Sequence, residues 1–379
     1  MRYYIIAGEA SGDLHGSNLM RELLKQDASA EIRFWGGDEM IKVGGTCVRH
    51  IRDLAIMGFI EVVAHLRTVL GNLSFCKRDI EAFRPDAIIY IDYPGFNLKI
   101  AHWAHRQGFR NFHYISPQLW AWKKGRLASM RRDLDALYYI LPFEQRFYAV
   151  NDMPQACFVG HPLLDAVTSM TPTEGDRTSQ KNNDVYQRPI IAMLPGSRRM
   201  ELKNMLPIML RTAGRHPEYR FVIAGMKLLG VQGYARYMKE APANVSIVYD
   251  QTYEVLSKAH AALICSGTAT LETALFDVPQ VVCYAGNALS YMIARAVVGR
   301  RIRFISLVNL IADRPILVEL LQDKLNDKNV EEEFVRIATD AAYRKEMREG
   351  YAEVRQLLGG PGASYRTAQH IIDTLRKTQ

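Results

Sequence analysis

The stretch "IIAMLPGSRRMEL" (residues 190–202) runs from apolar residues through a Pro-Gly-Ser turn into two arginines and then into residues that favour a helix. A strand that turns on glycine and opens a helix leaves backbone N–H groups unpaired, and the helix dipole adds positive charge there. This pattern suits a phosphate and is typical of an α/β protein. The alternative is a tight strand-to-helix turn whose arginines lie in solvent.

Bulk properties favour a globular protein with anionic partners. The chain has 379 residues, of which 48% are hydrophobic and 23% charged, which is enough for two domains with separate cores. It contains neither a run of about 20 apolar residues nor the features of a signal peptide, so we expect a cytoplasmic protein. The net charge of +8 suits nucleic acid, anionic lipid or a phosphorylated substrate.

The cysteines point away from disulfides and metal. There are five, an odd number, and they are widely spaced without a CxxC pair or a histidine at metal-ligand spacing. We interpret them as reduced thiols of the core.

Short apolar runs alternate with helical patterns in two series. The first series contains "RYYIIAGE", "IRFWGG", "DAIIYID", "NFHYIS" and "ALYYILPF", and the second contains "IIAMLPGS", "RFVIAG", "VSIVYD", "AALICSG" and "QVVCYA". A polar segment rich in Thr, Ser, Asn and Asp separates them and reads as a linker. We therefore predict two Rossmann-like α/β domains facing each other across a cleft. The boundaries are 1–167 and 190–358, with a linker over 168–189 and a C-terminal helix within 359–379 that crosses back to the first domain.

In open α/β sheets, ligands bind beyond the carboxyl ends of the strands, so the loops that follow strands are informative. The loop "AGEASGDLHG" (7–16) places Glu9, Ser11, Gly12 and Asp13 after the first strand. It lacks the GxGxxG spacing of a dinucleotide site, and its carboxylates would repel a pyrophosphate. We expect it to bind the hydroxyls of a sugar or to form a hinge.

The segment "IIYIDYPGFN" (88–97) places Asp92 at the end of a buried strand, before a Tyr-Pro-Gly turn. A partly desolvated aspartate at that position has a raised pKa and suits a general base. The alternative is an aspartate that caps the turn or the next helix.

The segment "ICSGTATLETALFDVP" (264–279) follows a strand of the second domain. Ser266, Gly267 and Thr268 at a helix N-terminus suit a diphosphate, and Glu272 one turn later suits the hydroxyls of a ribose. The alternative is a helix cap formed by Thr268, with Glu272 in the first turn. No DxD metal clamp follows a strand, so we expect Arg198 and helix dipoles, without a metal or cofactor, to neutralise the diphosphate.

With these loops placed, the chain resembles the lipid-A-disaccharide synthase family, inverting glycosyltransferases of the two-domain GT-B type. The resemblance covers nearly the whole chain. It rests on "AGEASGD", "LAIMGFIEVV", "IDYPGFN", "HYISPQLWAW", "LPFE", "FVGHPLLD", "LPGSR", "SGTATLE" and "SLVNLIA".

The resemblance implies a reaction and assigns residues to it. UDP-2,3-diacylglucosamine and 2,3-diacylglucosamine 1-phosphate would give a β-1,6-linked disaccharide 1-phosphate and UDP. Asp92 matches the family's catalytic aspartate. Arg198 matches the family's essential arginine, which would either stabilise the departing UDP or bind the phosphate of the acceptor. Arg199 stands where the family usually has a small residue. The implied UDP pocket consists of Gly196, Ser197, Arg198, Ser266, Gly267, Thr268, Glu272 and Asn309.

Both implied substrates carry acyl chains, which suggests an anionic membrane surface as a partner. The stretch "FIEVVAHLRTVLGNL" (59–73) has apolar residues at helical spacing, namely Ile60, Val63, Leu66, Val69, Leu70 and Leu73. Basic residues that would attract anionic lipid are Arg67, Lys123, Lys124, Arg126, Arg131 and Arg132. We expect peripheral association with the cytoplasmic face of the inner membrane, and the family suggests a homodimer. The alternative is that the apolar stripe packs on a core.

Two other functions compete with this interpretation. A UDP-sugar 2-epimerase shares the fold and the pocket glycines but would need acid and base groups for chemistry at C2. A nucleic-acid-binding protein is suggested only by the net charge and the mixture of aromatic and basic residues in "WAWKKGR", without a recognised binding motif.

Overall fold

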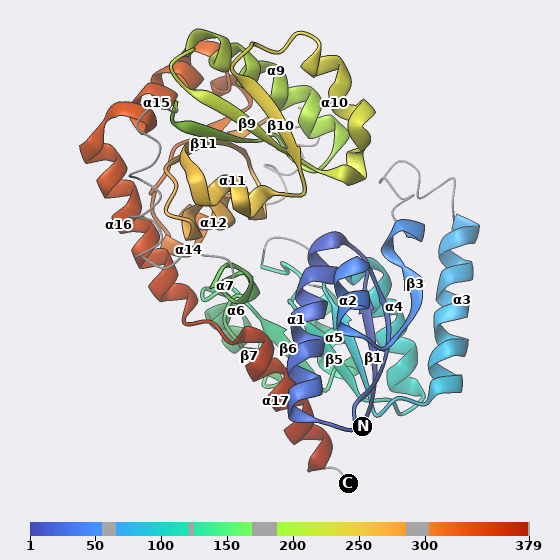
Figure 1. Ribbon diagram of the computed structural model, residues 1–379. Coiled ribbons are helices and arrows are strands. Elements are labelled where there is room, and N and C mark those ends of the chain that lie inside the picture. The colour runs from blue at the N-terminus through green and yellow to red at the C-terminus, as the bar shows by residue number, and fades with distance from the viewer. Residues whose placement is uncertain (55–65, 121–124, 169–187, 286–302, 378–379) are drawn as a thin grey trace. The chain divides into compact units, whose positions relative to one another are not determined.

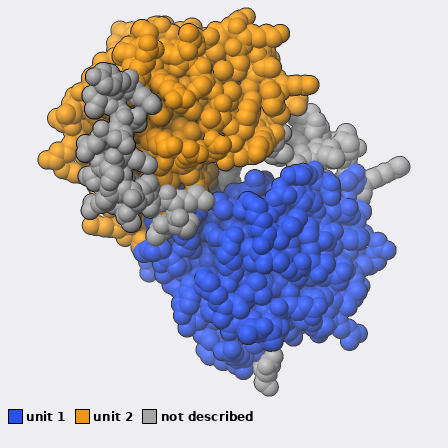
Figure 2. All heavy atoms as spheres, viewed as in Figure 1, with its two compact units in different colours: residues 1–166, 360–379 blue, residues 167–359 orange. Residues whose placement is uncertain are grey.

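The computed structural model describes residues 1–54, 66–120, 125–168, 188–285 and 303–377. The chain divides into two compact units, which are coloured separately in Figure 2. Unit 1 comprises residues 1–166 and 360–379, and unit 2 comprises residues 167–359. Each unit is a Rossmann-like α/β domain built on a parallel sheet, as predicted.

Unit 1 contains a seven-stranded parallel sheet in the order β3-β2-β1-β4-β5-β6-β7. The strands are β1 (Arg2–Ala7), β2 (Glu31–Gly36), β3 (Thr46–His50), β4 (Ala87–Ile91), β5 (Asn111–Tyr114), β6 (Ala136–Tyr139) and β7 (Ala156–Phe158). Its helices are α1 (Ala10–Gln26), α2 (Asp38–Val43), α3 (Leu66–Phe83), α4 (Pro94–Arg106), α5 (Arg126–Asp133), α6 (Glu144–Val150), α7 (Pro162–Thr168) and α17 (Ala363–Arg376).

Both faces of this sheet are buried, which explains why its central strands are continuous apolar runs. Along β1, Tyr3 and Ile5 belong to one hydrophobic cluster and Tyr4 and Ile6 to the other. Helices α1 and α17 contribute to the first cluster, and α3, α4 and α5 contribute to the second.

The C-terminal helix α17 packs beside α1, although the two are far apart in sequence (Figure 1). Its first turn is held by Asp165, whose carboxylate accepts hydrogen bonds from the N–H groups of Gly362, Ala363 and Ser364 at 2.5, 3.3 and 3.0 Å. These bonds satisfy donors that a helix start otherwise leaves unpaired, and so fix where α17 begins.

Unit 2 contains a six-stranded parallel sheet in the order β10-β9-β8-β11-β12-β13. The strands are β8 (Ile190–Leu194), β9 (Arg220–Gly225), β10 (Val245–Tyr249), β11 (Ala259–Cys265), β12 (Gln280–Tyr284) and β13 (Glu319–Leu321). Its helices are α9 (Arg199–Arg215), α10 (Gly230–Met238), α11 (Thr252–Lys258), α12 (Thr268–Leu275), α14 (Leu307–Ala312), α15 (Asp327–Thr339) and α16 (Ala341–Leu358). Within the described parts of the chain, we find no helix with the length and hydropathy that crossing a membrane requires.

The strand order reverses once in each sheet, and these reversals position the site. In unit 1 the chain runs from β1 outward to β3 and then returns to place β4 on the other side of β1. Unit 2 repeats this path, with β11 beside β8. Such switch points, at the carboxyl ends of the strands, are where open α/β sheets bind ligands.

Candidate active site

The loops singled out in the sequence follow β1, β4, β8 and β11, the strands that flank the two switch points. The loops after β1 and β4 belong to unit 1, and those after β8 and β11 belong to unit 2. The candidate residues therefore form two separate groups, one in each unit.

Asp92 lies immediately after β4 in an unusual backbone conformation. Both Asp92 and Tyr93 have positive φ angles, 44° and 47°. The Asp92 N–H donates to the carbonyl of Tyr114 at 3.0 Å, and Nδ2 of Asn97 donates to the Asp92 carbonyl at 2.7 Å. A tyrosine in the left-handed backbone conformation is strained. Such strain persists where surrounding contacts impose it, often at functional sites.

The β1–α1 loop packs directly on this turn. A Cβ atom on Gly8 would lie 2.4 Å from the ring of Tyr93, so the close approach of the two loops requires glycine at position 8. Burial raises the pKa of the Asp92 carboxyl to about 6, and the nearby charge of Glu9 adds to the rise. Tyr93, rather than Asp92, occupies the N-cap position of α4. The environment of Asp92 thus fits a general base.

The other polar residues of the β1–α1 loop differ in their surroundings. Ser11 is exposed, and Gly12 is buried against Ala7. Asp13 is 5% exposed, and its carboxylate accepts from the N–H groups of Gly37, Glu39 and Met40 at 2.6, 3.0 and 3.1 Å. These bonds tie α1 to the start of α2, which gives Asp13 a structural role that its sequence position did not reveal.

In unit 2, Arg198 occupies the N-cap position of α9, and its side chain is 78% exposed. The expectation that this turn leaves its N–H groups unpaired is wrong for Ser197 and Arg198. Both donate to Oε2 of Glu201, at 2.8 and 3.2 Å, because a glutamate one turn into a helix can reach back to its start. Arg199 is the first residue of α9 and is exposed.

The N-terminus of α12 is open where the sequence predicted a phosphate site. The N-cap residue is Gly267, without a side-chain cap, so the alternative in which Thr268 caps the helix is wrong. A Cβ atom built on Gly267 would meet no atom of the described residues within 4 Å. The N–H of Ser266 donates to the carbonyl of Cys283 at 3.0 Å, which fixes the preceding turn.

Glu272 lies one turn further along α12, beside a residue that the sequence analysis missed. The hydroxyl of Tyr253, on α11, donates to Oε1 of Glu272 at 3.1 Å. Burial raises the pKa of the Glu272 carboxyl, and the hydrogen bond from Tyr253 acts against that rise. A single tyrosine in a helix carries no sequence signal that would pair it with Glu272.

The loops after β8, β11 and β12 lie close together. The charges of Glu201 and Arg198 act in opposite directions on the pKa values of Cys265 and Tyr284, which burial raises. Nδ2 of Asn204, on α9, donates to the carbonyl of Ala285 at 2.7 Å. The carboxyl ends of the unit 2 strands therefore carry both the exposed Arg198 and the open N-terminus of α12.

Asn309 is 1% exposed, and its amide is engaged within unit 2. Its Nδ2 donates to the carbonyl of Leu317 and to Oε1 of Glu319, at 2.9 and 3.0 Å. Its Oδ1 accepts from the N–H groups of Ile316 and Leu317, at 2.8 and 3.1 Å. The amide thus holds α14 against the segment that leads into β13.

The apolar stripe proposed for the membrane is described only from Leu66, where α3 begins; Ile60 and Val63 lie outside the described residues. Val69 is half-buried and Leu70 is 53% exposed, whereas Leu73 packs against the core.

The basic cluster near α5 is described in part, because Lys123 and Lys124 lie outside the described residues. Arg132 pairs with Asp133 at 2.7 Å, and Arg131 donates to the carbonyl of Asn151. Charge pairing at Arg132 reduces the contribution expected of this cluster toward anionic lipid.

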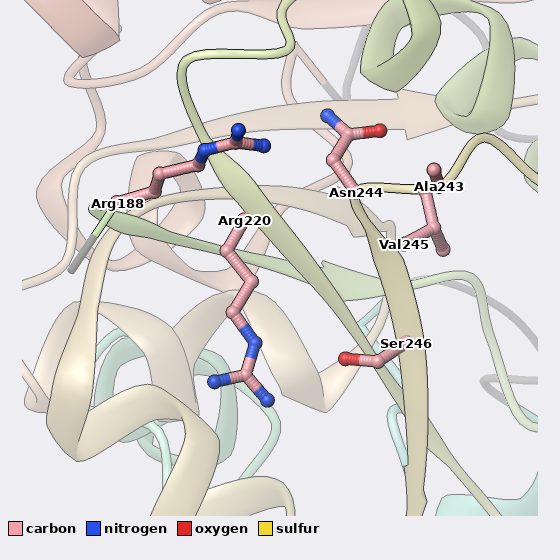
Figure 3. A pocket seen from close by; sticks show the side chains of 6 residues that line it. All are labelled: Arg188, Arg220, Ala243, Asn244, Val245 and Ser246. Atoms are coloured by element: carbon pink, nitrogen blue, oxygen red, sulfur yellow. The ribbon is translucent and has the colours of Figure 1, made fainter.

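A separate pocket lies near the amino ends of β8, β9 and β10, away from these loops (Figure 3). The residues that line it are Arg188, Arg220, Ala243, Asn244, Val245 and Ser246. The guanidinium groups of Arg188 and Arg220 extend in different directions (Figure 3), so they do not converge on one anion.

Comparison with known proteins identifies similar sequences and folds. The family model described as lipid-A-disaccharide synthetase matches residues 3–369. The lipid-A-disaccharide synthase of Geobacter metallireducens is 34% identical over 99% of this chain and 98% of its own length. That of Syntrophus aciditrophicus is 36% identical with the same coverage of each chain.

Solved structures share the fold at much lower identity. The UDP-GlcNAc 2-epimerase of Neisseria meningitidis bound to UDP-GlcNAc has a TM-score of 0.68 at 14% identity and covers 100% of both chains. The glycotransferase of kitacinnamycin has a TM-score of 0.65 at 16% identity and covers 99% of this chain and 98% of its own. Similarity at this level shows the two-domain fold alone.

Proposed function

Because the chain belongs to the lipid-A-disaccharide synthetase family, we propose that it condenses UDP-2,3-diacylglucosamine with 2,3-diacylglucosamine 1-phosphate and releases UDP. At the level of the family, it is a glycosyltransferase that forms the lipid A disaccharide. The observation that carries the finer proposal is the partly buried Asp92 at the switch point of unit 1, with a pKa raised to about 6.

Asp92 would remove the proton from the 6-hydroxyl of the acceptor as that oxygen attacks the anomeric carbon of the donor. An α-linked donor then gives a β-1,6-linked product, with inversion at the anomeric carbon. A pKa of about 6 leaves Asp92 largely ionised near pH 7, yet makes it a stronger base than an ordinary aspartate. Unit 1 therefore supplies the base.

Unit 2 would bind UDP. The exposed guanidinium of Arg198 offers a forked donor to phosphate oxygens, and the open N-terminus of α12 offers backbone N–H groups. Glu272 would accept hydrogen bonds from the ribose hydroxyls. Asn309 would support this pocket indirectly by holding α14 in place.

We expect the acidic limb of the kcat/KM pH profile to fall near pH 6, because a protonated Asp92 cannot act as the base. Glu9→Gln removes a negative charge that disfavours ionisation of Asp92. The pKa of Asp92 should therefore fall, and activity should persist to lower pH. Glu39→Gln, which removes a surface charge paired with Lys42, serves as the control. If Glu9→Gln does not shift the acidic limb, the charge of Glu9 does not affect the pKa of Asp92.

Glu272→Ala should weaken UDP binding by about 1–3 kcal/mol, because charge-assisted hydrogen bonds to the ribose are lost. Tyr253→Phe should have a smaller effect in the same direction, since it removes one bond that orients the carboxylate. Isothermal calorimetry with UDP measures both, and Glu332→Ala, on the surface of α15, is the control. If Glu272→Ala binds UDP normally and stays folded, the ribose contact is excluded.

We also propose that the exposed side of α3 contacts an anionic membrane surface, because both proposed substrates carry acyl chains and Leu70 is exposed there. Leu70→Ser should reduce sedimentation with phosphatidylglycerol-containing vesicles and leave the melting temperature nearly unchanged. Leu73→Ser should instead lower the melting temperature, since Leu73 packs against the core. Undiminished vesicle binding by Leu70→Ser would place the lipid contact elsewhere.

The epimerase alternative is not favoured. The family match extends over residues 3–369, whereas the likeness to the Neisseria epimerase stands at 14% identity and concerns the fold.

A further inference from the structure

The Glu201 carboxylate is hydrogen-bonded to two neighbouring backbone groups of the turn that carries Arg198. From the first turn of α9, its Oε2 accepts hydrogen bonds from the N–H groups of Ser197 and Arg198 at 2.8 and 3.2 Å. Gly196 has a φ of +110°, and a Cβ atom there would lie 2.4 Å from Oε2 of Glu201. The turn is thus wrapped around the carboxylate, and a side chain at position 196 would prevent the wrapping.

The same contacts leave the charged group of Arg198 available. Its Nη1 lies 4.0 Å from Oε1 of Glu201, at the outer limit of an ion pair, and the side chain is 78% exposed. An exposed pair at that distance contributes little attraction. Glu201 therefore fixes the backbone of Arg198 more strongly than it holds the guanidinium.

We propose that Glu201 is a positioning residue, which acts on the reaction through Arg198. By occupying the N–H groups of residues 197 and 198, its carboxylate sets the direction in which the Arg198 side chain leaves the turn. A phosphate on those same N–H groups would meet the negative charge of Glu201. The phosphate is consequently held by the guanidinium of Arg198 and not by the backbone of this turn. This inference rests on the proposed function, in which Arg198 contacts a substrate phosphate.

The test is a double-mutant cycle in the full-length chain. The variants are Glu201→Ala, Arg198→Ala and the double variant, and the readouts are kcat/KM, the Kd for UDP and the melting temperature. We expect Glu201→Ala to lower kcat/KM about 10-fold when Arg198 is present and less than about 2-fold when it is absent. Glu201→Gln keeps an oxygen acceptor for the two N–H groups and should retain most of the activity. Glu332→Ala again controls for loss of a surface carboxylate.

Several outcomes would overturn the proposal. An equal loss from Glu201→Ala with and without Arg198 would mean that Glu201 only stabilises the helix. Undiminished kcat/KM together with tighter UDP binding in Glu201→Ala would mean that the carboxylate only competes with the phosphate and does not position Arg198. If Glu201→Ala does not fold, the same cycle with Glu201→Gln must still show a loss that depends on Arg198. Normal activity of Arg198→Ala alone would instead contradict the proposed phosphate contact, so the two failures are distinguishable.

Discussion

Asp92→Asn should lower turnover by about 10²–10⁴-fold, while the protein stays folded and binds UDP with unchanged affinity. Asparagine cannot take a proton from the acceptor hydroxyl, but it keeps the shape of aspartate and tolerates a left-handed backbone. The turn with φ of 44° at position 92 should therefore survive the change. Steady-state turnover and UDP calorimetry on the same preparation separate loss of chemistry from loss of binding.

The control for this variant lies at the other end of the same strand. Asp86 precedes β4, and its carboxylate accepts a hydrogen bond from the backbone of Arg2 at 2.7 Å, away from the switch point. Asp86→Asn should leave turnover close to that of the unmodified enzyme. Near-normal turnover of Asp92→Asn would remove Asp92 from the role of base, and a loss of UDP affinity would indicate a wider structural effect.

The strands that the sequence analysis missed share a position in the sheets. Each expected strand is present, but β3, β7 and β13 were not foreseen. All three lie at sheet edges, and most of their residues are exposed or half-buried. An edge strand has one neighbour and an incomplete apolar cover, so its sequence does not need the continuous hydrophobic run of a central strand. The fourth edge strand, β10, keeps a largely apolar sequence (Val245–Tyr249) and was foreseen.

For the candidate site, the sequence predicts the positions of the loops but not the contacts of their side chains. Its loops could be located from sequence because glycines and polar residues follow apolar runs at strand ends. The sequence does not show whether a polar side chain faces a ligand or its own backbone. The carboxylates of Asp13 and Glu201 accept hydrogen bonds from backbone N–H groups. The carboxylate of Asp92 is instead partly buried near the charge of Glu9. Only the folded chain distinguishes these environments.

Arg198→Ala should lower turnover by about 10²–10³-fold, as expected when a group that stabilises the negative charge on the departing UDP is lost. Arg198→Lys should restore only part of the activity, because a guanidinium binds two phosphate oxygens at once and an ammonium acts as a point charge. Because the Arg198 side chain is 78% exposed, the melting temperature should change little. Turnover, UDP affinity and thermal unfolding are measured for all three proteins.

Arg199 provides a matched control for Arg198, since it is the next residue, carries the same charge and is also exposed. The two differ in backbone position, because Arg198 is the extended N-cap residue that donates to Glu201, whereas Arg199 begins the helix. Arg199→Ala should therefore reduce turnover far less than Arg198→Ala. If the reaction responded only to local positive charge, both alanine variants would lose the same activity. A higher salt concentration would then reduce the contributions of both arginines to turnover equally. Equal losses would thus contradict a directed contact between Arg198 and a phosphate.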